Sequence, residues 1–278
     1  MTTSPHFCGG PRQGGPRQGD PRQGGPRQGR TLARRLASRV RQGAAALRCR
    51  LPAPCPLCLA GARGGALCPP CQNDLRATSS LVRCPRCALR LDGHAACPDC
   101  AVRMPAFTYA ITAFDYSPPA DALILQLKQS LRVSRAGMLG GLLAEAVRRD
   151  PRGLPPGAIL VPIPSSPPAL RRRGFNPAAE IARAAAGSLD LEVCVDVLAS
   201  RGANLAPQRT LARQARLAQA AERFELRGPA PRRTLAVVDD VMTTGATLHA
   251  AAQLLCDAGA AAVVALAVAR TPYGRLPS

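Results

Sequence analysis

Eight of the twelve cysteines form four C-x2-C pairs, and their spacing constrains the fold more than any other feature of the chain. The pattern C-x2-C-x9-C-x2-C occurs twice, and each cysteine of the first copy recurs 29 positions later. Two intervening residues let two thiolates of one tight turn reach the same metal ion. The pattern predicts a double zinc ribbon over residues 51–104 with two structural zinc ions. The predicted ligands are Cys55, Cys58, Cys68 and Cys71, then Cys84, Cys87, Cys97 and Cys100.

Four thiolates per ion leave no open coordination position, so this zinc is structural and not catalytic. A redox C-x-x-C site would not require four pairs in register. The spacing leaves open whether each ion takes neighbouring or interleaved pairs. With little apolar content, the segment is expected to fold only with its metal.

Residues 1–50 form an Arg/Gly/Pro-rich arm in which GPRQG recurs over residues 10–29. This segment has eleven Arg and one Asp, which is half of the formal net charge of +20. It has no apolar face to bury, so we expect a disordered arm with a short basic helix over 31–48. Such an arm either holds polyanions by counterion release or is simply solvated. Since no apolar run reaches the roughly 18 residues of a membrane span, we expect a soluble, cytoplasmic protein.

From about Phe107 onward, apolar runs alternate with helical periodicity, which predicts an α/β domain over residues 105–278 with a mainly parallel sheet flanked by helices. The expected strands are 158–164, 234–240 and 261–269, and residues 109–116 are expected to form a strand or a hairpin. The expected helices are 119–129, 136–148, one capped by Asn176, and 245–258.

Two adjacent carboxylates, Asp239 and Asp240, follow the apolar run that begins at Thr234. Ligands of open α/β sheets bind beyond the carboxyl ends of the strands, where this pair is expected. The small residues that follow predict a tight turn whose backbone N–H groups seat a phosphate at a helix N-terminus. They are Thr243, Thr244, Gly245, Ala246 and Thr247. The combination suits a ribose 5-phosphate, with the carboxylates accepting hydrogen bonds from the sugar hydroxyls.

The stretch VVDDVMTTGATL resembles the phosphoribosyl-pyrophosphate (PRPP) signature of type I phosphoribosyltransferases. It is similar to the ComF family together with LKQSLR (127–132), VPIPSS (161–166), RRRGFN (171–176), the stretch from Gln208 to Phe224 and the paired cysteine knuckles. The resemblance covers about residues 50–272 in the same order. It implies the type I phosphoribosyltransferase fold after a double zinc ribbon.

The same resemblance implies the site. Asp239 and Asp240 would hold the ribose of PRPP, residues 243–247 its 5-phosphate, and the turn with Ser165 would lie by the pyrophosphate. Mg²⁺ would accompany PRPP, and Arg173, the last of three consecutive arginines, is a candidate to neutralise the departing pyrophosphate.

The stretch 199–220 resembles the loop that closes over PRPP in related enzymes, with Arg216 as its candidate catalytic residue. Gln219 stands where the family usually has an asparagine, so the loop chemistry departs from the family pattern. Lys128, the only lysine, and Arg132 are weaker candidates. His249 is expected to be packed or exposed and not catalytic.

Two functions remain open, beside a plainer third interpretation in which the ribbons only brace the domain or form a protein interface. The first is a phosphoribosyltransferase that releases pyrophosphate, linked by resemblance to DNA uptake in natural transformation. The second is a non-enzymatic PRPP sensor or scaffold that engages single-stranded DNA or a helicase partner through the ribbons and the arm. The chain has no Trp and eight Phe and Tyr in all, which counts against base stacking. The acceptor and the oligomeric state are not indicated.

Overall fold

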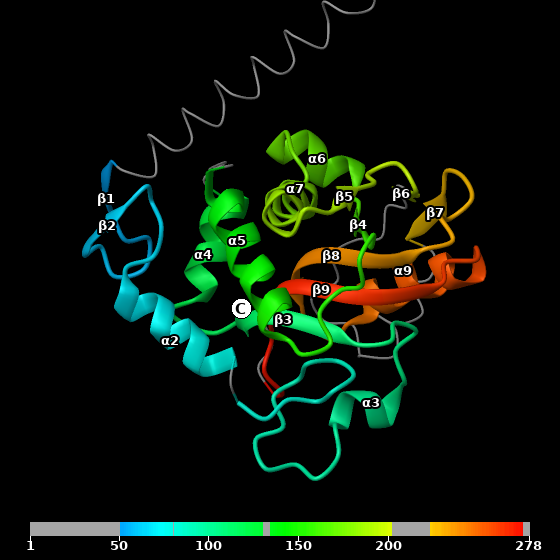
Figure 1. The fold of residues 1–278 in the computed structure, drawn as a ribbon, viewed down its shortest axis with the longest axis horizontal. Helices are drawn as coiled ribbons and strands as arrows, with labels where there is room; N and C mark the ends of the chain where they lie inside the picture. The colour runs from blue at the N-terminus through cyan, green and yellow to red at the C-terminus, as the bar shows by residue number, and fades with distance from the viewer. Residues whose placement is uncertain (1–50, 80, 130–133, 202–222, 275–278) are drawn as a thin grey trace, which may run out of the picture. The chain divides into compact units, whose positions relative to one another are not determined.

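The computed structural model describes residues 51–79, 81–129, 134–201 and 223–274 (Figure 1). A five-stranded sheet lies at its centre, in the order β3-β9-β8-β4-β5. Every neighbouring pair is parallel. The strands are β3 (Ala110–Asp115), β4 (Ile159–Pro162), β5 (Glu192–Val193), β8 (Thr234–Met242) and β9 (Ala262–Arg270). The predicted α/β class with a mainly parallel sheet is confirmed.

Helices cover both faces of this sheet. On one face lie α4 (Asp121–Gln129), α5 (Ser134–Arg149) and α7 (Pro177–Leu189), and on the other lies α9 (Ala246–Asp257). Successive side chains of β8 alternate between the faces, because Val237 packs in the cluster of α9 and Val238 in that of α5 and α7. Burial on both faces explains why the central strands are continuous apolar runs.

The packing of α5 against α7 depends on Gly140. A Cβ at this position would lie 2.5 Å from the Cβ of Ala184 and 2.8 Å from the carbonyl oxygen of Ile181. Only a residue without a side chain allows the two helices to approach this closely. Gly140 therefore allows α5 to lie directly against the backbone of α7 at this point.

Several short elements were not predicted from the sequence. They are α6 (Pro167–Arg173), β5, and the antiparallel pair of β6 (Leu198–Ser200) and β7 (Phe224–Leu226). Such short segments carry too little periodicity to be recognised. The prediction of a loop from residue 199 is corrected, because β6 extends to Ser200. The rest of that loop from 202, with Arg216, lies outside the described residues, as do Arg132 and the arm and helix expected in residues 1–50.

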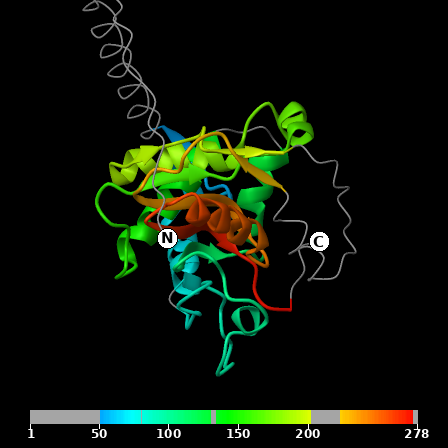
Figure 2. The same ribbon diagram turned by 90° about the vertical axis from the view of Figure 1, so that its right-hand side faces the viewer.

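The cysteine-rich segment lies beside the β3 edge of the sheet. It contains β1 (Pro52–Pro54), β2 (Gly61–Arg63), α2 (Pro69–Ser79) and α3 (Pro98–Val102). Figures 1 and 2 both show the part with α3 next to β3. In the part of the chain that the structure describes, no helix combines the length and apolarity needed to cross a membrane.

Candidate ligand site and metal centres

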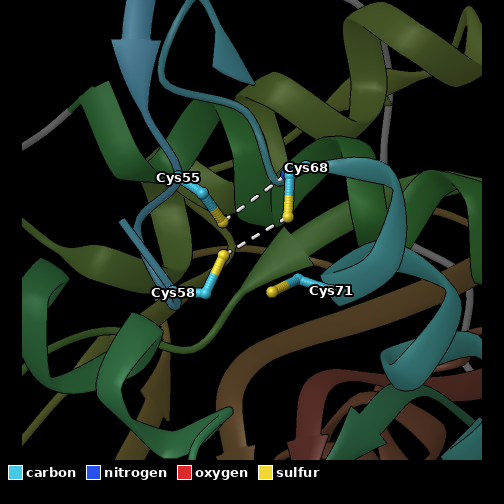
Figure 3. Close-up of side chains that lie close together, drawn as sticks. All are labelled: Cys55, Cys58, Cys68 and Cys71. Atoms are coloured by element: carbon cyan, nitrogen blue, oxygen red, sulfur yellow. Dashed lines mark hydrogen bonds between the residues drawn. The ribbon is translucent and has the colours of Figure 1, made fainter. Parts of the chain in front are cut away.

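Each cysteine quartet is formed by two neighbouring pairs. In both quartets the four sulfur atoms lie within 4.8 Å of one another. Figure 3 shows the first quartet, where the side chains of Cys55, Cys58, Cys68 and Cys71 converge. The pairing left open by the spacing is therefore between neighbours and not interleaved. Four converging thiolates are the ligand set of a structural zinc ion, so both quartets fit this metal.

The electrostatics of the quartets also fit a cation. The amide of Cys68 points to the Cys55 sulfur at 3.5 Å, a contact typical of thiolate knuckles. Burial, together with the neighbouring sulfur atoms, raises the pKa of the Cys71 and Cys100 thiols. Thiolates this close repel one another, and a divalent cation at their centre removes that cost.

The duplication read from the sequence is repeated in the backbone. Leu59 donates its amide hydrogen to the Cys55 carbonyl, and Ala88 donates to the Cys84 carbonyl, both at 3.0 Å. Leu59 and Ala88 both have left-handed backbones, with φ values of 62° and 55°. Each of these turns holds the first C-x2-C pair of its copy, so the two copies share one local structure.

The two copies attach to opposite faces of the sheet. In the first copy, Leu75 of α2 is buried in the apolar cluster that α4, α5 and α7 form on one face of the sheet. Gln126 of α4 also donates a 3.1 Å hydrogen bond to the Pro56 carbonyl. In the second copy, Cys87 and Leu89 are buried in the cluster of α9. The ribbons are therefore integrated into the core of the α/β domain on both sides.

The buried carboxylate of Asp115, at the end of β3, anchors the second copy. It pairs with Arg83 at 2.7 Å and with Arg90 at 3.1 Å. These two arginines flank the first knuckle of the copy and also form an antiparallel bridge. Because a buried carboxylate needs such partners, the pairing ties the ribbon firmly to the edge strand.

The two adjacent carboxylates lie near the carboxyl end of β8, which continues through them to Met242. Asp240 is buried, and its amide donates a 2.8 Å hydrogen bond to the Asp239 carboxylate. The Asp240 carboxylate faces α4, where Lys128 Nζ lies 2.8 Å from its Oδ2 atom. The weak candidate Lys128 is thus brought directly to the carboxylate pair.

Burial, reinforced by the charge of Asp240, raises the pKa of Asp239 to about 7. Lys128 acts in the opposite direction and lowers it. Lys128 therefore neutralises the negative charge of the Asp239–Asp240 pair only in part. A ligand that brings positive charge or hydroxyl donors to these oxygens would be stabilised here.

The turn after β8 opens α9 as the sequence predicts. Gly245 precedes the helix with φ 74°, and a Cβ there would lie 2.7 Å from the terminal methyl carbon of Met242. The amide of Ala246 points to the Thr244 hydroxyl oxygen at 3.4 Å. Thr243, Thr244 and Thr247 are half-buried, while Gly245 and Ala246 are buried. Backbone amides at the positive end of α9 are suited to an anion.

The predicted pyrophosphate turn lies beside this site. β4 and β8 are parallel neighbours, and the Ile163 amide donates to the Val238 carbonyl at 2.9 Å. In that turn the Ser165 hydroxyl donates to the Asn176 side-chain oxygen at 3.1 Å, and the Asn176 amide group donates to Ile163. Asn176 also caps α7, as expected. Ser165 therefore donates its hydroxyl proton to another residue of the protein.

The candidate arginines are placed differently. Arg173 ends α6 and is half-buried, whereas the two arginines before it are exposed. Among the described residues, none forms an ion pair with these three arginines. The stretch containing Arg216 is bounded by the β6–β7 pair, where Arg201 donates its amide hydrogen to the Arg223 carbonyl at 2.9 Å. The two residues that flank this stretch, Arg201 and Arg223, therefore lie side by side.

Two further residues near the turn are buried. The Nδ1 atom of His249 accepts a 2.9 Å hydrogen bond from the Ala106 amide, and burial lowers its pKa, so it is packed as expected. Sequence reasoning missed Arg270, which is 1% exposed at the end of β9 and contacts both the turn and the second ribbon. In the sequence, the one sign of Arg270 was its position directly after an apolar run.

The chain is similar to named bacterial proteins over most of its length. It is 33% identical to the DNA utilization protein YhgH of Escherichia coli K12 over 207 residues, covering 74% of this chain and 84% of that protein. It is also 33% identical to the Salmonella typhi protein of that name over 212 residues, covering 74% and 90%.

No family model matches the sequence. Among solved structures, TT1426 from Thermus thermophilus is similar with 21% identity and a TM-score of 0.31, over 51% of this chain and 86% of that one. The identity and coverage shared with these two relatives show that the chain belongs to the family of the DNA utilization protein YhgH.

Proposed function

We propose that this chain is a ComF-like protein that binds PRPP with Mg²⁺ at the carboxyl ends of β4 and β8. Residues 51–104 would serve as its zinc ribbon module and residues 105–278 as its ligand-binding domain. The observation that carries the proposal is the Asp239–Asp240 pair, followed at once by the turn that opens α9.

Each part of PRPP has a chemical counterpart at this site. The carboxylates of Asp239 and Asp240 accept hydrogen bonds from the ribose hydroxyls, and the amides of residues 243–247 donate to the 5-phosphate. The turn at Ser165 is next to this seat because β4 pairs with β8. Lys128 offsets part of the repulsion between the carboxylates and holds Asp240 toward α4.

Mg²⁺ fits the carboxylate oxygens, which are hard donors, and when bound with PRPP it would supply positive charge at the pyrophosphate oxygens. For transfer, the bond between C1 and the pyrophosphate oxygen breaks with its electron pair leaving on pyrophosphate. The acceptor bonds to C1 through a lone pair and loses its proton to solvent. We assign stabilisation of that departing charge to Arg173 and Arg216. Closure by the stretch containing Arg216 would exclude water from the sugar.

A second candidate is PRPP binding without transfer, as a sensor or scaffold in DNA utilization. It is favoured by the Ser165 hydroxyl, whose proton is held by Asn176 and not directed toward a ligand. The curated relatives are named for DNA utilization and not for a transfer reaction. In this function the ribbons and basic arm would engage single-stranded DNA or a helicase partner.

Isothermal titration of the zinc-loaded chain with PRPP and Mg²⁺ tests the binding common to both candidates. The parent is expected to bind, and the double variant Asp239→Asn, Asp240→Asn is expected to lose at least about a hundredfold in affinity, the equivalent of two charged hydrogen bonds. Asp257→Asn is the control for loss of an aspartate charge outside the site, because Asp257 lies at the exposed far end of α9. A folded parent that does not bind would refute the assignment.

Pyrophosphate release separates the two candidates. With a panel of purine, pyrimidine and amine acceptors, a transferase releases pyrophosphate with at least one of them and loses this activity on Asp240→Asn. A sensor binds PRPP and releases none. For the DNA function, anisotropy with a single-stranded oligonucleotide should show affinity that falls steeply with salt and with removal of residues 1–50.

A further inference from the structure

Arg270 connects three parts of the fold through one buried guanidinium group. Its Nε atom donates to the Cys87 carbonyl at 3.1 Å, and its Nη2 atom donates to Asp99 Oδ2 at 2.7 Å. Its Nη1 atom donates to the carbonyls of Met242 and Thr271 at 3.1 Å, and also to that of Thr243. A planar group with fixed donor directions holds all these acceptors in one relative arrangement.

On one side of this group is the second cysteine quartet. Cys87 is one of its predicted ligands, and Asp99 lies between the ligands Cys97 and Cys100 on α3. The Arg270 and Asp99 side chains are 1% and 8% exposed, so their ion pair is shielded from water. This pairing can persist only while the ribbon keeps its fold, and we expect that fold to require the metal.

On the other side is the turn proposed to seat the phosphate. Met242 and Thr243 offer their carbonyls to Arg270 immediately before Thr244 and Gly245. A cleft separates this turn from the ribbon and is lined on its two sides by residues that include Cys100 and Gly245. The guanidinium group, at the end of β9, is hydrogen-bonded both to this turn and to the ribbon.

We propose that Arg270 is a positioning residue that couples the metal state of the second quartet to the conformation of the 243–247 turn. Loss of metal from this quartet frees Cys87 and Asp99, and Arg270 then has no fixed partners on the ribbon side. A buried guanidinium group left half-paired must shift, and the carbonyls of Met242 and Thr243 shift with it. The coupling rests on the proposed function only where this turn is treated as a ligand seat.

Among the described residues, the first quartet has no equivalent contact with the turn. Its polar link to α4 runs from Pro56 to Gln126, and its apolar contacts are with the cluster of α4 and α5. Of the two metal sites, only the second therefore touches the described turn through a side chain. We expect the turn to respond more strongly to loss of metal from the second quartet than from the first.

Amide hydrogen exchange of the zinc-loaded full chain tests the coupling without any ligand. In Arg270→Met, exchange in peptides covering 243–248 is expected to rise at least about tenfold, while amides of β8 stay protected. The matched control is Arg152→Met, because Arg152 donates to the Pro85 carbonyl of the same ribbon without touching the turn. Unchanged exchange in the turn of folded Arg270→Met would overturn the proposal.

A second pair of variants tests the coupling if Arg270→Met does not fold. Cys97→Ser with Cys100→Ser removes metal from the second quartet, and Cys68→Ser with Cys71→Ser removes it from the first. The first of these double variants is expected to deprotect 243–248 by at least about tenfold more than the second. Equal protection in the two double variants would overturn the coupling.

Titration with PRPP and Mg²⁺ separates failure of this inference from failure of the proposed function. If the parent binds and Arg270→Met loses affinity together with turn protection, both hold. If the parent does not bind while the turn is still deprotected in Arg270→Met, the ligand assignment is wrong and the coupling stands. If the parent and Arg270→Met bind equally and show equal exchange, the coupling is wrong.

Discussion

The Lys128 ammonium group lies 2.8 Å from the Oδ2 atom of Asp240 and links α4 to the end of β8. The only lysine of an arginine-rich chain is thus placed at the carboxylate pair. A compact ammonium group pairs with one carboxylate oxygen without the forked geometry that a guanidinium group requires.

Lys128→Met removes a charge that lowers the pKa of Asp239, so that pKa is expected to rise above about 7. At pH 7 fewer chains then carry both charges, and affinity for PRPP with Mg²⁺ should fall about tenfold. Titrations between pH 6.5 and 8.5 measure this loss, which should shrink as pH rises. Lys128→Arg keeps the charge and is expected to bind better than Lys128→Met; equal affinity of parent and Lys128→Met would contradict the prediction.

Asp239 should make the free energy of unfolding depend on pH. Its pKa is about 7 in the folded chain against 3.8 for an ordinary aspartate, so folding takes up a proton between these values. The free energy of unfolding therefore falls as pH rises through this window.

Asp239→Asn should remove that fall and be more stable than the parent at pH 8, by on the order of 2 kcal/mol. Urea unfolding at pH 5 and pH 8 measures the difference, and Asp257→Asn should keep the slope of the parent. A parent whose stability rises steadily from pH 5 to pH 8, with Asp239→Asn doing the same, would show that Asp239 has no raised pKa.

The full chain should bind two zinc ions, one in each quartet. Native mass spectrometry of the chain purified with zinc is expected to show two ions, and replacement of two ligands in either quartet should leave one. Chelation should lower the melting temperature, because both ribbons contribute side chains to the core clusters. The first ribbon contributes Leu75 and the second ribbon contributes Leu89. Retention of two ions after loss of two ligands would contradict the assigned ligand sets.

Gly245→Ala should destabilise the turn that opens α9. Its φ of 74° is unfavourable for alanine, and the new methyl group would meet Met242 at 2.7 Å. We expect a loss of about 1 kcal/mol in the free energy of unfolding, with Met242 taking up part of the clash, together with weaker phosphate binding. Gly187→Ala, on the exposed side of α7 with no atom within 4 Å, should instead be neutral or stabilising.

The elements that could be predicted are those with a repeating local signal. The apolar runs of β4, β8 and β9 and the periodicity of α5 indicated a parallel sheet with helices on it. The two-residue strand β5 and the three-residue strands β6 and β7 have no such signal, because their pairing depends on neighbours far along the chain. The sequence predicted that β8 ends at Asp240, which is too early for the same reason, because its pairing with β9 continues to Met242.

The sequence by itself determined the eight ligand cysteines and the glycine turn after Asp240, because ligand spacing and backbone conformation are local properties. The division of the cysteines into two quartets of neighbouring pairs came from the tertiary structure. Tertiary structure alone decided that Lys128 faces Asp240 and that Arg270 pairs with Asp99, 171 positions away. Those contacts exist because the sheet places the ends of β8 and β9 side by side, with α4 on one face and the second ribbon on the other. A buried charge finds its partner by that packing, which no spacing along the chain encodes.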